Sequence, residues 1–255
     1  MAMRHSKIST FAVTVIALSL GGVTATAAEL KVSGAAAIAN TIVVPNKAAI
    51  EAETGLTLAV TVNGDANGLK DLYGGKSDVM MVAAPLKATE DSINKAAPGS
   101  VSATGLQMSQ VGTIAIRFII NPANPVKSLS EAQVKDILTG KITNWKEVGG
   151  PDQPVLVVAE VPGFGTRTNV VTTFLGGTEI SDKARMVQAL VQVAQVVGQA
   201  PWAIGYGNAG SITPAVTVLP NHEVKQPIGF ATKGAPSSDA KKLIDAAAKY
   251  SASVK

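Results

Sequence analysis

The chain has 255 residues, of which 46% are hydrophobic and 16% are charged, and this balance excludes wholesale disorder. It has no cysteine and only two histidines, which excludes a disulfide framework and a cysteine-ligated metal and argues against a Ser-His-Asp triad. The formal net charge of +4 falls to +2 when Arg4 and Lys7 are left out, since both lie in a segment that we expect to be removed. Such a small charge does not favour nucleic-acid binding, and we expect no metal and no cofactor.

The amino end of the chain has the pattern of a secretory signal peptide. The positive charges of Arg4 and Lys7 precede an apolar stretch over residues 11–23, and Ala-Thr-Ala at residues 25–27 has the small residues of a cleavage site. The apolar stretch is shorter than the roughly 20 residues that a transmembrane helix needs. We therefore predict a signal peptide over residues 1–27, cleavage near Ala27, and export of the mature protein to the periplasm.

The first half of the mature chain alternates β-rich runs with helical patterns. We predict strands over residues 30–32, 56–62 and 78–83. We predict helices over residues 35–54, with an interruption near Pro45, and over residues 69–73. This alternation of strands and helices favours an α/β fold with a largely parallel sheet.

The second half opens with a strongly apolar strand over residues 113–121, which Pro122 ends. The sequence Ser130-Glu131-Ala132-Gln133 is a capping box and predicts a helix that ends at Gly140. The further predicted strands cover residues 155–159, 202–206, 216–219 and 228–232. The further predicted helices cover residues 167–175, 181–197 and 238–250.

The predicted elements fall into two α/β groups, residues 28–112 and residues 113–208. The remaining residues, 209–255, have no partner group of their own size, so we expect them to return to the first group. We therefore predict two lobes joined by a hinge, with a ligand-binding cleft between them.

Three loops share one plan, in which a strand is followed by a glycine-containing turn and then by a helix. They comprise residues 34–37, 64–68 and 163–166. Helix N-termini at the carboxyl ends of strands offer free amides to an anion, so three such loops could form an anion cradle. The alternative is that the glycines serve only tight turns.

Several short stretches of the mature chain match one known family. The most specific is Leu138-Thr139-Gly140-Lys141-Ile142-Thr143-Asn144-Trp145. Others lie at residues 67–69, 75–79, 85–87, 163–167 and 203–206. Together they resemble the phosphate-type solute-binding proteins of bacterial ABC importers over nearly the whole mature chain. The resemblance implies a two-lobed, type II periplasmic-binding-protein (Venus-flytrap) fold, a small-molecule ligand, an ABC permease in the inner membrane as partner, and no enzymatic activity. We expect a monomer.

The positions that hold the oxyanion in that family carry different residues here. Ala35 and Ala36 stand in the first loop in place of hydroxyl side chains, and Ala83 stands at a usual serine. Glu160 and Phe164 stand where the family has an arginine and a serine. Each lost charge-assisted hydrogen bond removes about 1.5–3 kcal/mol, and a carboxylate at residue 160 would repel an anion. We therefore predict that the ligand is an organic or apolar solute rather than phosphate.

Three alternatives stay open. Thr166, Arg167 and the amides of the third loop could still hold phosphate or another oxyanion. The fold could instead serve a ligand-sensing envelope protein without a transporter. An exported enzyme could use Asp65, Asp78 and Glu160 as acids, although no histidine or cysteine stands in a candidate loop.

Two aromatic residues, Phe164 and Trp202, favour a larger and more apolar cleft, unless they only fill the cores of the lobes. Asp65 and Glu160 could meet a cationic group. Arg117 is a charge within an apolar strand and lies either on a solvated sheet face or in the cleft wall. The candidate ligand-binding residues are Gly34, Ala35, Ala36, Asp65, Asn67, Ala83, Glu160, Phe164, Gly165, Thr166, Arg167 and Trp202.

Overall fold

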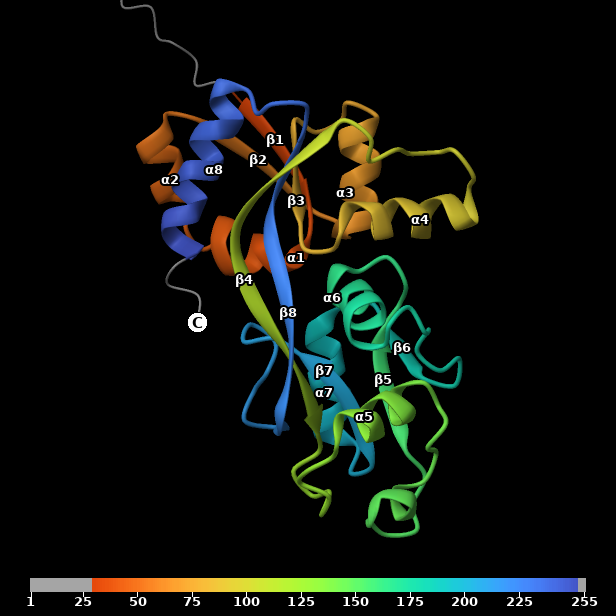
Figure 1. Cartoon of the computed structure of the whole chain (residues 1–255). Coiled ribbons are helices and arrows are strands. Elements are labelled where there is room, and N and C mark those ends of the chain that lie inside the picture. The colour runs from red at the N-terminus through yellow and green to blue at the C-terminus, as the bar shows by residue number, and fades with distance from the viewer. Residues whose placement is uncertain (1–28, 252–255) are drawn as a thin grey trace, which may run out of the picture.

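The computed structural model describes residues 29–251, which form two lobes, one above the other in the view of Figure 1. The predicted signal peptide lies outside the described residues. One eight-stranded sheet runs through both lobes, and helices pack against it (Figure 1). Within residues 29–251, no helix is both long enough and apolar enough to cross a membrane.

The sheet is mixed. Its strands are β1 Glu29–Gly34, β2 Thr57–Val62, β3 Val79–Val82, β4 Leu106–Ile120, β5 Leu156–Glu160, β6 Arg185–Val187, β7 Ala203–Gly207 and β8 Thr217–Lys233. They are hydrogen-bonded in the order β2-β1-β3-β8-β4-β7-β5-β6. β1 pairs in parallel with β2 and β3, and β5 pairs in parallel with β6 and β7, whereas β4 and β8 are antiparallel to their neighbours. The predicted parallel pairing therefore holds only at the outer part of each lobe.

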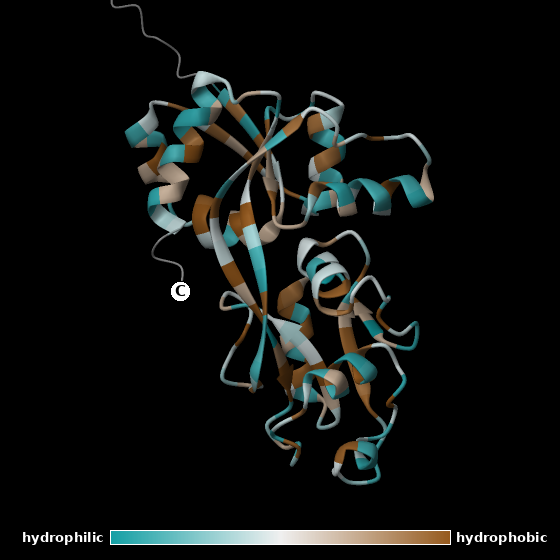
Figure 2. Cartoon of the chain, viewed as in Figure 1, coloured by the Kyte–Doolittle hydropathy of each residue, from teal (hydrophilic) through white to brown (hydrophobic). Residues whose placement is uncertain are grey.

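Helices connect these strands and cover the sheet. The α-helices are α1 Ala36–Ile38, α2 Lys47–Thr54, α3 Gly64–Tyr73, α4 Leu86–Ala96, α5 Glu131–Leu138, α6 Gly165–Asn169, α7 Leu190–Gln199 and α8 Ser238–Ser251. The π-helical segments η1 Ala39–Val43 and η3 Val170–Phe174 directly continue α1 and α6, and η2 Trp145–Val148 is a 3₁₀ turn. Apolar residues follow the strands inside both lobes, whereas α4 is mainly hydrophilic (Figure 2).

The predicted capping box is present at the start of α5. The Ser130 hydroxyl accepts a hydrogen bond from the Gln133 amide at 3.2 Å, and the Gln133 side chain accepts one from the Ser130 amide at 2.8 Å. Two of the amides that a helix leaves without partners at its start are thus satisfied. The helix presents Val134, Ile137 and Leu138 to the core of the second lobe.

β4 and β8 pair along most of their length and cross from one lobe to the other, so they form the hinge (Figure 1). Ile114 of β4 and Ile228 of β8 belong to the apolar core of the first lobe. Ile116 and Val224, only a few residues away, belong to the core of the second. The change of core therefore falls near residue 115 on β4, close to the boundary expected after residue 112. On β8 it falls between residues 224 and 228, whereas the expected boundary was after residue 208.

Three elements differ from the sequence predictions. The strands predicted over residues 216–219 and 228–232 are one strand, β8, which contains Pro220 and Pro227. Asn221 has a left-handed φ of 67°, and here the pairing of β4 with β8 shifts register. The helix predicted over residues 181–197 is limited to α7, with β6 before it, and α4 was not predicted.

Candidate ligand-binding site

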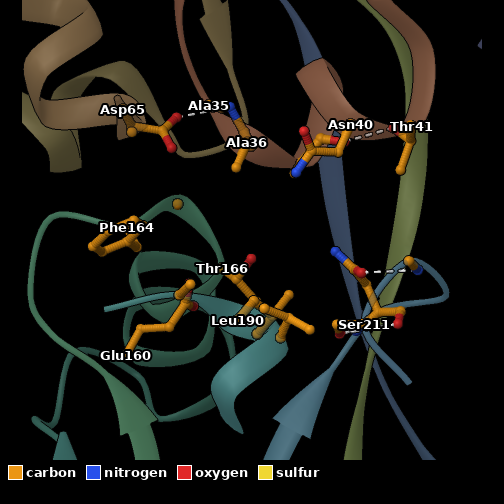
Figure 3. A pocket seen from close by; sticks show the side chains of 18 residues that line it. Ala35, Ala36, Asn40, Thr41, Asp65, Glu160, Phe164, Thr166, Leu190 and Ser211 are labelled. Carbon is orange, nitrogen blue, oxygen red and sulfur yellow. Dashed lines mark hydrogen bonds between the residues drawn. The ribbon is translucent and has the colours of Figure 1, made fainter. Parts of the chain in front are cut away.

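A cavity of about 140 Å³ lies between the two lobes (Figure 3). From the first lobe it is lined by Ala35, Ala36, Ala37, Asn40, Thr41, Gly64, Asp65 and Ala83. From the second lobe it is lined by Glu160, Phe164, Gly165, Thr166, Ala189, Leu190 and Val191. Asn208, Gly210 and Ser211, between β7 and β8, complete the lining. No lysine, arginine or histidine of residues 29–251 is among these residues, so the charged groups of the wall are carboxyls.

The first loop contributes a small, apolar surface. Gly34 ends β1 with a φ of 128°, and a side chain there would lie 2.4 Å from the Met81 carbonyl oxygen, so only glycine fits. The Ala35 amide donates to the same Met81 oxygen at 2.9 Å. This close packing turns the chain so that Ala35 and Ala36 present methyl groups to the cavity (Figure 3). Gly34 itself lies behind the wall and does not line the cavity.

Asp65, at the start of α3, is held by two main-chain amides that follow β3. Its Oδ1 accepts hydrogen bonds from the Ala83 amide at 2.8 Å and the Ala84 amide at 3.0 Å. A side chain on Gly165, in the other lobe, would lie 2.3 Å from Asp65 Oδ2, so glycine there lets the two lobes meet. The Asp65 side chain is only 2% exposed. Burial raises its pKa to about 6, and the amide hydrogen bonds oppose this rise.

Glu160 is the second carboxyl group of the cavity wall, and it differs from Asp65 in its partners. It ends β5, where its amide donates to the Tyr206 hydroxyl at 3.1 Å and its carbonyl oxygen accepts from Arg167 at 3.0 Å. The residue is 3% exposed, and within the described chain its Oε2 has no hydrogen-bond partner. Burial, and then the charge of Asp65, raise the pKa of Glu160 to about 8.

Phe164 and Thr166 frame the second-lobe side of the cavity (Figure 3). Phe164 is the residue before α6, and its ring lies close to Gly64 of the first lobe. Thr166 is buried in the first turn of α6. The turn that the sequence analysis singled out therefore reaches the cavity with an aromatic ring and one hydroxyl group.

Arg167 and Trp202 point elsewhere, which corrects the expectation that they line the cleft. The Arg167 guanidinium is 5% exposed and lies inside the second lobe, where Nη2 pairs with Glu179 at 3.1 Å. Trp202 packs against the core of the second lobe, and its carbonyl oxygen accepts from the Trp145 indole at 3.0 Å. The more apolar character of the cavity thus comes from Phe164 and not from Trp202.

Two more predicted residues lie away from the cavity. Asn67 is exposed on α3, where its side chain donates to the Asn63 carbonyl oxygen at 3.1 Å. Arg117, whose place the sequence left open, is half-exposed, and its guanidinium lies 3.6 Å from Glu223. It lines a second cavity beside the hinge strands, together with Lys225. The predicted residues that do line the central cavity are Ala35, Ala36, Asp65, Ala83, Glu160, Phe164, Gly165 and Thr166.

Sequence reasoning missed the residues that hold the lobes together. The Ala83 carbonyl oxygen accepts hydrogen bonds from the side chains of Asn169, on α6, and Gln226, on β8. The Asn169 amide group also donates to the Gly165 carbonyl oxygen at 2.8 Å. Gln226 is fully buried, and its sequence neighbours, which include Glu223 and Lys225, gave no signal of this. Through these hydrogen bonds the two lobes are in contact beside the cavity.

Comparisons with known proteins agree with this architecture. A family model described as a PBP superfamily domain matches residues 22–249. The phosphate-binding protein PstS of Bacillus subtilis is 28% identical over 178 residues, which are 70% of this chain and 56% of that protein. The chain therefore spans little more than half the length of this relative.

Two solved structures share the fold over most of both chains. A substrate-binding protein from Clostridium perfringens with bound phosphate has a TM-score of 0.71 at 24% identity, over 86% of this chain and 92% of that chain. An ABC-type phosphate transport receptor from Vibrio cholerae has a TM-score of 0.66 at 21% identity, over 86% and 93%. The family resemblance and the two-lobed fold expected from the sequence are both confirmed. The chain belongs to the PBP superfamily and is similar to PstS phosphate-binding proteins.

Proposed function

We propose that this chain is the periplasmic solute-binding component of an ABC importer and that it holds a small organic solute, not phosphate, between its lobes. The observation that carries the proposal is the charge of the cavity wall, where two buried carboxyl groups, Asp65 and Glu160, face the space and basic side chains are absent from the lining residues. The membership in the family supports the binding and transport part, because its members bind small ligands and work with ABC permeases.

The electrostatics of the wall argue against phosphate. A buried anion needs hydrogen-bond donors or cations that replace its water shell, and leaving its charge uncompensated costs several kcal/mol. Here the nearest guanidinium, on Arg167, is already paired with Glu179. Two buried amides beside the cavity, those of Ala83 and Ala84, already donate to Asp65. These two donors are therefore not available to an oxyanion.

Solute capture would work through closure of the lobes about β4 and β8. In an equilibrium of open and closed forms, a ligand favours the form with which it makes more contacts. A solute in the cavity touches both lobes, so its binding favours the arrangement in which Asn169 and Gln226 donate to Ala83. In this proposal the permease recognises that closed form.

Phosphate is the competing ligand, since the relatives named above bind it, and one titration separates the two cases. The mature chain, residues 28–255, is stripped of bound solute by unfolding and refolding and is then titrated with inorganic phosphate by calorimetry. We expect no heat of binding. Micromolar or tighter binding would overturn the choice of ligand, and in that case Thr166 and the loop amides suffice for an oxyanion. In parallel, mass spectrometry of the unstripped protein is expected to reveal a co-purified organic molecule.

A further inference from the structure

We propose that the solute is a small organic cation, whose primary ammonium group binds the Glu160 carboxyl group while its carbon chain packs against Phe164 and the loop alanines. This inference rests on the proposed function and names the ligand class of the same cavity.

Glu160 has a buried side-chain oxygen without a hydrogen-bond partner in the described chain. Its side chain is buried and lines the cavity, where Figure 3 places it near Phe164 and Thr166. Its Oε2 receives no hydrogen bond from the described chain. A buried polar atom without a partner is unfavourable, and more so if it carries charge. With a pKa near 8 the Glu160 carboxyl group is largely protonated at neutral pH, and a bound ammonium group would favour its ionised form, which only accepts hydrogen bonds. The ammonium group supplies both the donors and the opposite charge.

Asp65 also favours a cationic ligand, although its own carboxyl oxygens are already in contact with the protein. Its Oδ1 is satisfied by two amides, and its second oxygen is packed against Gly165. It therefore adds negative charge to the cavity while Glu160 offers the open acceptor. The neighbouring cation, Arg167, donates to the Glu160 carbonyl oxygen, to Met186 and to Glu179, and it makes no hydrogen bond to the Glu160 carboxyl group.

The rest of the wall sets the size and the apolar character of the ligand. Ala35, Ala36, Phe164 and Leu190 present methyl groups and one aromatic ring. A cavity of about 140 Å³ is close to the engineered apolar cavity of about 150 Å³ that holds benzene, so about six non-hydrogen atoms fit. A cation near the ring of Phe164 is also attracted by the negative face of the ring. These features describe a short-chain primary amine.

Three short-chain probes test the inference: n-butylammonium, n-butanol and n-butyrate, each titrated by calorimetry into the stripped mature chain. The first two have the same shape and differ in the charge and hydrogen bonding of the head group, and n-butyrate carries the opposite charge on a chain of similar length. We expect n-butylammonium to bind at least about tenfold more tightly than n-butanol, and n-butyrate not to bind. Equal binding of the alcohol, tighter binding of the acid, or no binding of the amine would overturn the cation inference.

A matched pair of variants then assigns the effect to one carboxyl group. Glu160→Gln keeps the shape and removes the charge, and we expect it to weaken n-butylammonium at least about tenfold and to leave n-butanol within about twofold. Asp182→Asn removes an exposed carboxylate of the same lobe and should change neither. An unchanged affinity for the amine in Glu160→Gln contradicts the inference, and circular dichroism checks that the variant is folded.

The pH profile of the wild type provides a readout that needs no variant. The charged or titratable groups nearest the Glu160 carboxyl are Asp65 on α3, Arg167 on α6 and Tyr206 on β7. Since the pKa of Glu160 lies near 8, binding of n-butylammonium should strengthen between pH 6 and pH 8, while binding of n-butanol stays constant. A flat profile for the amine overturns the inference. Tight binding of phosphate is a different result, because it overturns the proposed function itself.

Discussion

The two walls of the cavity each bury one carboxyl group, and the walls treat these groups differently. In the first lobe, Asp65 accepts from the amides of Ala83 and Ala84 and packs against Gly165. In the second lobe, Glu160 is fixed through its main chain, and its Oε2 has no partner in the described chain. Burial of a carboxyl group therefore does not by itself identify a ligand contact. The satisfied carboxyl group of Asp65 links loops of the fold, and in our proposal the Glu160 carboxyl group recognises the solute.

The largest effect on stability is expected for the variant Asp65→Ala. It leaves the two amides of Ala83 and Ala84 buried without an acceptor, and each is unfavourable by about 1–3 kcal/mol. We expect the free energy of unfolding in urea at pH 7 to fall by about 2–5 kcal/mol. Asp71→Asn, also on α3, is the control and should stay within about 1 kcal/mol of the wild type. A loss below that of the control would mean that Asp65 does not support the loop.

A second variant reverses the charge of the other wall. Glu160→Arg with Phe164→Ser restores the residue types that the resembling family has at these positions. The guanidinium would supply charge-assisted hydrogen bonds of about 1.5–3 kcal/mol each, so we expect phosphate affinity to rise by about 100-fold or more. Calorimetry with phosphate measures this gain, and Phe164→Ser alone is the control. If the folded double variant binds phosphate no better than that control, the charge at residue 160 does not decide the ligand.

The pH dependence of stability separates the two carboxyl groups. Both have raised pKa values in the folded chain, near 6 for Asp65 and near 8 for Glu160, against 3.8 and 4.5 in their unperturbed state. The folded protein therefore binds more protons than the unfolded one over these windows, and its stability falls as pH rises. We expect a fall from about pH 4 to pH 8 in the solute-free wild type. In Glu160→Gln the fall should end near pH 6, and a fall that continues to pH 8 would contradict the assignment to Glu160.

The smallest expected effect concerns the contact between the lobes. Asn169→Ala removes hydrogen bonds to the Ala83 and Gly165 carbonyl oxygens, which are worth about 1 kcal/mol each. We expect a loss of about 1–2 kcal/mol in the free energy of unfolding and a larger radius of gyration in X-ray scattering of the solute-free chain. Asn67→Ala on the exposed face of α3 is the control. A variant that scatters like the wild type would show that this contact does not keep the lobes closed.

The sequence predicted the fold and much of the cavity wall because local chemistry decides both. Gly34 takes the positive φ of the turn that ends β1, and the Ser130 capping box sets the start of α5. The directions in which long side chains point could not be predicted, because they depend on partners that are distant in the sequence. Arg167 turns to Glu179, which lies 12 residues later, and the carbonyl of Trp202 is taken by Trp145, 57 residues earlier.

The course of β8 was hidden for a different reason. Pro220 and Pro227 are turn signals in the sequence, and they divide the strand into two predicted pieces. In the folded chain β4 supplies a long partner, and the register shift at Asn221 absorbs the irregular residues. Pairing between strands that lie about a hundred residues apart in the chain overrides the local pattern, and this pairing moves the lobe boundary to the far side of residue 224.

The central claim is that the Glu160 carboxyl group makes the cavity bind a cation and not phosphate. A competition titration tests this claim most directly. The stripped mature chain is titrated with n-butylammonium, once in a phosphate-free buffer and once with inorganic phosphate in large excess. The account predicts a measurable affinity for the amine that is the same in both buffers at equal ionic strength. Loss of amine binding in the phosphate buffer, or a heat of binding for phosphate itself, would contradict it.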